Sequence, residues 1–162
     1  MQAQQTEQIT TEKTAAVDAV ALLESQHREV EVLFKEFEGA SDKAFKKKEK
    51  IAAAICEKLT MHAKIEESVF YPAAKEADDD LVLESFEEHA NVKAMIRKIS
   101  RTAASDETYD AKVTVLKDLV EHHVKEEEED LFPKCRKALG DEAILDLGAK
   151  MQAKMERLEA MN

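Results

Sequence analysis

The sequence has 162 residues, which is enough for one domain with a substantial core and too few for two independent ones. Helix-favouring residues dominate, while three Gly, two Pro and no Trp leave little material for turns or strands, so we expect an all-α protein. The formal net charge of −11 opposes approach to phosphate backbones and to anionic lipid, so nucleic acid and membrane are not expected as partners.

The first part of the chain predicts a polar arm and two long helices. Residues 1–15 carry too little apolar surface to repay ordering, so we expect a flexible N-terminal arm there. Apolar residues then recur at three- and four-residue steps, which predicts helices over about residues 16–38 and 43–71. Pro72 is expected to end the second helix, because proline cannot continue an α-helical hydrogen-bond ladder.

The second part predicts two more long helices and a shorter C-terminal one. The periodicity favours helices over about residues 77–102 and 109–131, the latter ending before Pro133. Residues 136–162 contain a last amphipathic segment, which either packs outside the bundle or pairs with another copy of the chain. Four long helices with short connections predict an antiparallel up-down four-helix bundle over residues 16–135, with an additional C-terminal helix.

Four of the five histidines fall within the apolar stripes of the predicted helices, one on each helix of the bundle. They are His27, His62, His89 and His123. A single histidine on an apolar face is usually a core residue bonded to a carbonyl, but several imidazoles in one core each need a partner. One bound metal can serve several of them while their second nitrogens bond outward, so the pattern predicts a metal site.

Two glutamates share the faces of these histidines, because Glu66 follows His62 by four residues and Glu127 follows His123 by four. Burying two ionised carboxylates without compensation is costly, so their position calls for cations inside the bundle. The spacing alone is weak, since His27 with Glu31 and His122 with Glu126 also match it. The other glutamates of these stretches are expected to face solvent: Glu31, Glu67, Glu126, Glu128 and Glu129.

An internal repeat selects the two pairs. MHAKIEESVFYP (61–72) recurs as HHVKEEEEDLFP (122–133), with His, Lys, Glu, Glu and Pro at the same places. His27 and His89 precede the two copies by similar distances. Two similar helix pairs about a pseudo-twofold axis predict two equivalent metal positions, with the carboxylates near the axis where they can bridge.

The pattern His27, His62 with Glu66, His89, and His123 with Glu127 resembles the haemerythrin-like, or HHE cation-binding, family. The resemblance covers about residues 17–135 and implies a four-helix bundle around two Fe ions joined by an oxo or hydroxo bridge, with both glutamates bridging. Oxygen-carrying members have a further His one turn before the third-helix His. Ser85 stands there in this chain, which leaves an additional position open.

Two other metal chemistries fit less well. A ferritin-like carboxylate centre needs two ExxH motifs, and Glu24 with His27 is the single match. Zinc accepts imidazole, but six nitrogen and oxygen donors with bridging carboxylates suit iron or manganese better than a four-coordinate zinc site.

We expect the centre to bind dioxygen or a related small ligand such as peroxide or nitric oxide. The alternatives are a di-iron enzyme of peroxide or nitric oxide detoxification, and an iron or redox sensor acting through a protein partner. The residues alone do not separate carrier from enzyme. Cys56 and Cys135 lack CxxC spacing and no long apolar run is present, which favours a cytoplasmic protein, either monomer or homodimer.

Overall fold

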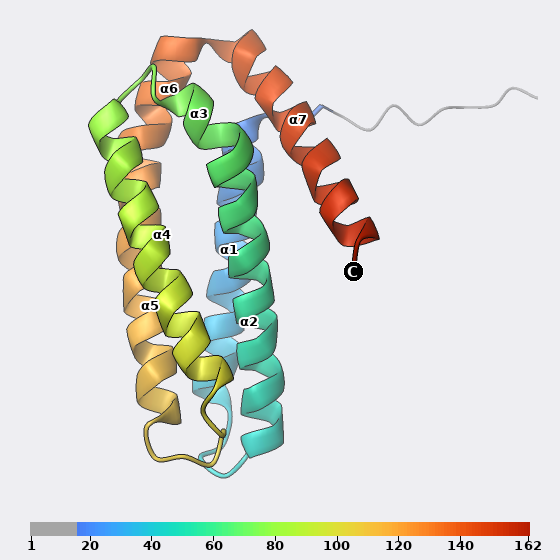
Figure 1. The fold of residues 1–162 in the computed structure, drawn as a ribbon, viewed down its shortest axis with the longest axis vertical. Helices are drawn as coiled ribbons and strands as arrows, with labels where there is room; N and C mark the ends of the chain where they lie inside the picture. The colour runs from blue at the N-terminus through green and yellow to red at the C-terminus, as the bar shows by residue number, and fades with distance from the viewer. Residues whose placement is uncertain (1–15) are drawn as a thin grey trace, which may run out of the picture.

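The computed structural model describes residues 16–162, so the expected arm over residues 1–15 lies outside the described part of the chain. The predicted all-α up-down bundle is confirmed (Figure 1). Its four long helices run in alternating directions: α1 (Ala19–Gly39), α2 (Phe45–Ile65), α4 (Asp79–Ser100) and α5 (Tyr109–Glu126).

Two aspartates fix where bundle helices begin. The Asp18 carboxylate accepts a hydrogen bond from the Ala21 backbone N–H at 2.7 Å, and Asp78 accepts one from the Leu81 N–H at 3.0 Å. Each carboxylate satisfies a backbone donor that has no partner within the helix, which stabilises the first turn of α1 and of α4.

Two π-helical turns interrupt the regular helices at corresponding places of the repeat. They are η1 (Glu66–Phe70) after α2 and η2 (Glu127–Leu131) after α5. The Tyr71 N–H bonds the carbonyl of Glu66 and the Phe132 N–H bonds that of Glu127, five residues back instead of four. Each π turn therefore begins at one of the two predicted bridging glutamates, in line with the tendency of such turns to occur at functional sites.

The expected helix ends at Pro72 and Pro133 are wrong. The chain continues helically through both prolines into α3 (Tyr71–Ala74) and α6 (Phe132–Leu139). Each proline lies in the first turn of the new α segment, directly after a π turn. The missing N–H and fixed φ are tolerated there, because the preceding hydrogen-bond ladder has already changed its spacing.

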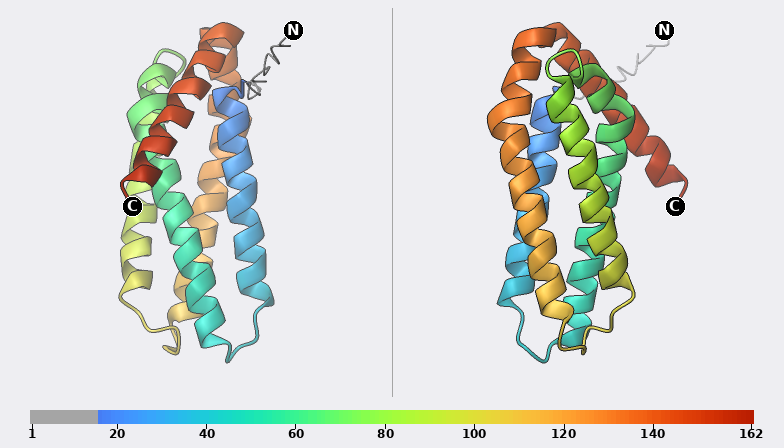
Figure 2. Two further views of the ribbon diagram at one scale, coloured as in Figure 1. Left: turned by 90° about the vertical axis from the view of Figure 1, so that its right-hand side faces the viewer. Right: turned by 60° about the vertical axis from the view of Figure 1, so that its left-hand side comes forward.

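The C-terminal helix α7 (Asp141–Ala160) begins after Gly140, whose φ of +82° suits glycine. It lies outside the bundle against α1 and α2, at the end where α3 and α6 also lie (Figure 2). Gly148 allows this approach, because a Cβ added there would lie 2.1 Å from the Val17 carbonyl oxygen.

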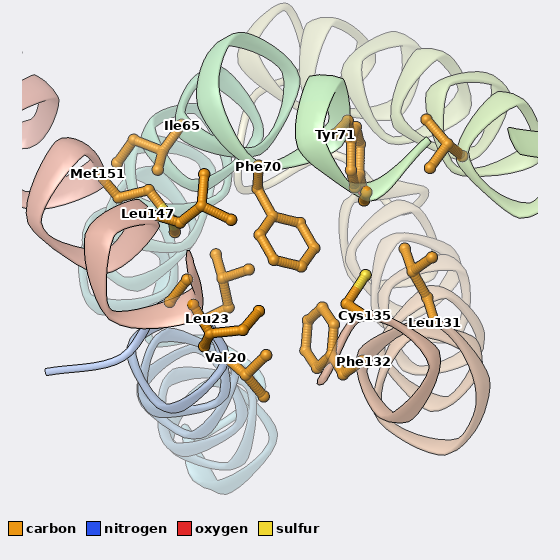
Figure 3. Close-up of a cluster of buried hydrophobic side chains, with 14 residues drawn as sticks. Val20, Leu23, Ile65, Phe70, Tyr71, Leu131, Phe132, Cys135, Leu147 and Met151 are labelled. Carbon is orange, nitrogen blue, oxygen red and sulfur yellow. The ribbon is translucent and has the colours of Figure 1, made fainter. Parts of the chain in front are cut away.

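Two apolar clusters fill the bundle, one towards each end. The upper cluster contains Leu23, Phe70, Phe132 and Met151, which point toward one another from four parts of the chain (Figure 3). The lower cluster holds buried residues near the α1–α2 and α4–α5 connections: Phe34, Phe37, Ile55, Leu59, Ile99, Val113, Leu116 and others. Within residues 16–162, every helix is too short or too polar to cross a membrane.

Candidate metal centre

A buried polar layer separates the two apolar clusters. All six predicted site residues lie in it: His27, His62, Glu66, His89, His123 and Glu127. One histidine comes from each long helix, and each glutamate is the first residue of a π turn. Glu66 is 0% exposed and Glu127 is 1% exposed, so water cannot hydrate the charge of either carboxylate.

The two carboxylates link histidines from different helices. Glu66 Oε1 lies 2.7 Å from His62 Nε2 on its own helical segment and 3.2 Å from His89 Nε2 on α4. Glu127 Oε1 lies 3.0 Å from His123 Nε2 and 3.3 Å from His27 Nε2 on α1.

The donor atoms form two compact groups of three. One group is His27, His62 and Glu127, and the other is Glu66, His89 and His123. Within each group the donor atoms lie within 4.8 Å of one another. Each group thus takes its carboxylate from the opposite half of the repeat, which is the arrangement expected of two carboxylates placed to bridge two positions.

The inner atoms fit metal ions better than they fit one another. His27 Nε2, His62 Nε2, both oxygens of Glu66 and Glu127 Oε1 are buried without a hydrogen bond of acceptable geometry. Several of these atoms are within about 3 Å of a neighbour, but they do not aim at each other along hydrogen-bond directions. Buried polar atoms of this kind require a partner, and imidazole and carboxylate donors suit a transition-metal cation.

The outer nitrogens of three histidines bond acidic or amide side chains. His123 Nδ1 lies 3.0 Å from Glu88, His62 Nδ1 lies 2.7 Å from the Gln26 Oε1, and His27 Nδ1 lies 3.4 Å from Glu128. The outer nitrogen of the fourth, His89 Nδ1, makes no hydrogen bond and has the Glu67 carboxylate 3.7 Å away. Partners of this type fix the orientation of an imidazole and raise its basicity as a ligand.

Two of these partners contradict the sequence prediction that Glu67 and Glu128 face solvent. Their side chains are only 22% and 24% exposed. Each glutamate directly follows a site glutamate, so it points about 100° around the helix, far enough to reach the histidine of a neighbouring helix. Lys93 binds Glu67 at 2.7 Å and Arg28 binds Glu128, which anchors both carboxylates.

Tyr71 is a site residue that the sequence prediction did not include. Its buried hydroxyl donates to Glu127 Oε2 at 3.0 Å and lies 3.1 Å from His89 Nε2 and 3.4 Å from His123 Nε2. The second copy of the repeat has Phe132 at this place. The Tyr-for-Phe difference between two otherwise similar copies was the signal available in the sequence.

Ser85 is buried near Tyr71, but its hydroxyl donates to the Leu81 carbonyl at 2.8 Å. The one donor of the Ser85 hydroxyl is therefore used within its own helix. Tyr71 brings an additional polar group to the Nε2 side of the His89–His123 half, where the extra histidine of oxygen carriers is absent.

Burial and charge act in opposite directions on the pKa values of the centre. Burial lowers the pKa of His123, but the Glu127, Glu66 and Glu88 carboxylates outweigh it and raise that pKa well above its usual value. Burial raises the pKa of Glu66, but the neighbouring histidines, His62 first, hold it well below its usual range. Burial, together with Glu66 and Glu127, raises the pKa of Tyr71, so the hydroxyl keeps its proton at neutral pH.

His122 lies outside the centre, as expected, and its side chain is 67% exposed. Its Nε2 lies 3.2 Å from Glu126 and 3.4 Å from Glu88. Burial and the Glu88 carboxylate raise the pKa of Glu126. The adjacent residues His122 and His123 thus lie in different surroundings, one exposed and one buried in the centre, because one step along a helix turns a side chain by about 100°.

Comparison with known proteins agrees with this geometry. The sequence profile of the Hemerythrin HHE cation binding domain matches residues 18–135. The chain belongs to this family. The haemerythrin HHE assignment covers all six site residues, so the domain is a cation-binding one, in agreement with the clustered His and Glu donors.

Two relatives of this haemerythrin HHE chain are informative. A crystal structure of a Hemerythrin HHE cation binding domain-containing protein from Mycobacterium kansasii, an Rv2633c homologue, superposes with a TM-score of 0.77 at 27% identity, covering 87% of this chain and 86% of that one. A protein named DNA nickase from Nostoc sp. is 27% identical over 142 residues, which is 85% of this chain. The chain spans only 39% of that relative's length.

Proposed function

We propose that the chain holds two iron ions between the His27–His62 and His89–His123 pairs, with Glu66 and Glu127 bridging them, and binds dioxygen or a related small ligand there. The observation that carries the proposal is the composition of the two donor groups. In each group the two histidines come from one half of the repeat and the glutamate comes from the other half. Donors that are all nitrogen and oxygen, with two bridging carboxylates, favour iron over four-coordinate zinc.

Iron bound in this centre would supply the electrons and the open coordination positions that dioxygen binding needs. The chain supplies orientation, because the imidazoles of His123, His62 and His27 are held from outside by Glu88, Gln26 and Glu128. It also supplies exclusion of water, since the apolar clusters close the polar layer on both sides. A dry surrounding slows loss of a bound ligand by side reactions with solvent.

A second candidate function is turnover of peroxide or nitric oxide, and Tyr71 favours it. Reduction of peroxide or nitric oxide takes up protons, and peroxide disproportionation moves protons from one oxygen to another. The Tyr71 hydroxyl is a protonated donor 3.0 Å from Glu127 and close to two histidines. The position occupied by histidine in oxygen carriers is the buried Ser85, which adds no imidazole to this half of the centre. We propose this enzyme activity as the alternative to reversible binding.

A DNA-directed activity is not part of the proposal. The relative named for DNA nicking is much longer than this chain, and the net charge of −11 opposes binding to a duplex. A sensor role, in which metal loss loosens the bundle and changes contacts of α7, stays a third proposal.

Metal content per chain is the first test, and the proposal requires about two irons in protein isolated with iron supplied. The reduced protein is then exposed to air without oxygen-consuming additives. A reversible absorption band supports the carrier, whereas steady gas evolution from added peroxide supports the enzyme. Fewer than about two irons per chain in the wild type, or an iron content that is unchanged in a His89→Ala variant, contradicts the two-metal centre.

A further inference from the structure

A small cavity adjoins the histidines on the side of the lower apolar cluster. Its volume is about 30 Å³, and its wall is almost entirely carbon. Besides Gln26 and the four site histidines, the lining residues are Val30, Leu59, Ala63, Val92, Val120 and Val124. A single water needs roughly 10–15 Å³ measured in this way, so the cavity has room for a diatomic molecule beside the imidazoles.

Two larger hollows lie against this cavity from opposite sides of α1. The first, of about 170 Å³, lies between α1 and α5 and shares His27, Val30, Val120 and Val124 with the cavity. The second, of about 410 Å³, lies between α1, α2 and α7 and shares Gln26, Val30 and His62 with it. Either hollow could lead from solvent to the centre, so the partitions between them and the cavity decide the route.

The partition towards α7 has two polar members, Gln26 and His62, beside Val30, and hydrogen bonds fix the polar members. Gln26 accepts a hydrogen bond from His62 Nδ1 at 2.7 Å and donates one to the Met155 sulfur at 3.4 Å. Moving Gln26 would break both bonds and release an imidazole of the centre, which makes this side costly to open.

The partition towards α5 is apolar. Apart from His27, it consists of the buried Val30, Val120 and Val124, whose side chains can shift without breaking a hydrogen bond. In addition, α1 packs mainly against α2, and α5 mainly against α4, so this partition lies at a seam between helix pairs. The mouth of the hollow carries the Lys117–Glu38 ion pair at 2.6 Å, which joins α5 to α1.

We propose that small uncharged molecules, dioxygen or nitric oxide, reach the centre from the hollow between α1 and α5 through the gate formed by Val30, Val120 and Val124. This inference rests on the proposed function for its ligand. An apolar gate admits an uncharged diatomic readily, whereas an anion such as azide has to lose its hydration, so the gate selects against charged ligands.

The kinetic test is stopped-flow binding of nitric oxide to the reduced, iron-loaded full chain. Val124→Phe should slow association by about tenfold, because a ring in the packed gate has to be displaced. Val124→Ala should raise the association and dissociation rates together and leave the affinity nearly unchanged, which is the signature of a barrier. Val115→Phe is the matched control, since Val115 lies on the same helix and is 44% exposed.

The competing route is tested by Ala54→Phe, which places a ring in the hollow beside α7. The proposal expects no change in the association rate. Slower association in this variant, with normal rates in Val124→Phe, would overturn the proposal and assign access to the other side.

A measurement without iron separates failure of the route from failure of the proposed function. In zinc-loaded full-length protein under oxygen pressure, dissolved dioxygen should relax the methyl signals of Val30, Val120 and Val124 more strongly than those of Val115. Equal relaxation of all of them, or the strongest effect at Met155, would refute the gate even if nitric oxide did not bind the iron form.

Discussion

Replacing Tyr71 by Phe should lower the free energy of unfolding of the metal-free protein and shift the absorption of the metal-loaded centre. The change removes one hydroxyl and keeps the ring, which packs on Phe86 at 5.2 Å and on Phe70 at 6.2 Å between centroids. The lost group donates to the Glu127 carboxylate at 3.0 Å in a fully buried position. A hydrogen bond to a charged buried group contributes about 1.5–3 kcal/mol, so the free energy of unfolding should fall by that amount.

Urea unfolding of the metal-free chains measures this loss directly. Tyr109→Phe is the matched control, because it removes the same atom from another buried ring in the lower apolar cluster, away from the centre. Its loss should be clearly smaller. In iron-loaded protein, Tyr71→Phe should shift the absorption of the centre, whereas Tyr109→Phe should not. Equal stability losses in the two variants, with unchanged spectra, would refute the assignment of Tyr71 to the centre.

Three further outcomes follow from the structure. In metal-free protein the pKa values of His27 and His123 are raised, so their contribution to stability is present below pH 6.5 and is lost as pH rises through the raised values. The pKa of Glu66 is lowered, so its contribution is present above pH 4.5 and is lost as pH falls through the lowered value. Urea midpoints of the metal-free chain should therefore be highest between pH 4.5 and pH 6.5, and a maximum at alkaline pH would contradict the shifts. Chelation of the loaded protein should lower the melting temperature strongly, since a ligand at about a thousand times its Kd stabilises the folded state by about 4 kcal/mol, and an unchanged melting curve after verified metal removal would count against a structural contribution of the metals. Gly148→Ala should destabilise the chain by about 1–3 kcal/mol in urea despite the better helix propensity of Ala, because its Cβ would meet backbone at 2.1 Å, whereas Gly39→Ala, with open space around it, should not.

The sequence was sufficient for the bundle and for the placement of the six central residues. Helical periodicity determines which face a residue occupies, so the four-residue spacing placed His62 and Glu66 on one face, and the apolar stripe that contains His62 indicated that this face is buried. The internal repeat then separated Glu127 from Glu126, because register within the repeat distinguishes neighbours that spacing cannot. The structure brings all six residues together, while their binding of iron stays a prediction.

The features that escaped prediction depend on backbone spacing and on contacts between helices. A change from four-residue to five-residue hydrogen bonds leaves no mark on hydropathy, so the sequence predicts neither η1 nor η2 and instead predicts helix ends at the two prolines. Glu67 reaches His89 across a helix boundary, a contact that no single-helix pattern contains. Tyr71 was hidden for the same reason, since its partners come from α4, α5 and η2.

The paired π turns have a consequence for anyone who would transplant this centre into a designed scaffold. A π turn accommodates one residue more than the α-helix around it, so every side chain beyond Glu66 or Glu127 is offset by one place from an ideal helix. Copying the donors onto regular helices would keep the two HxxxE motifs but would point Tyr71 and the residues of α3 and α6 in the wrong directions. A designed scaffold therefore has to keep the additional residue of each π turn.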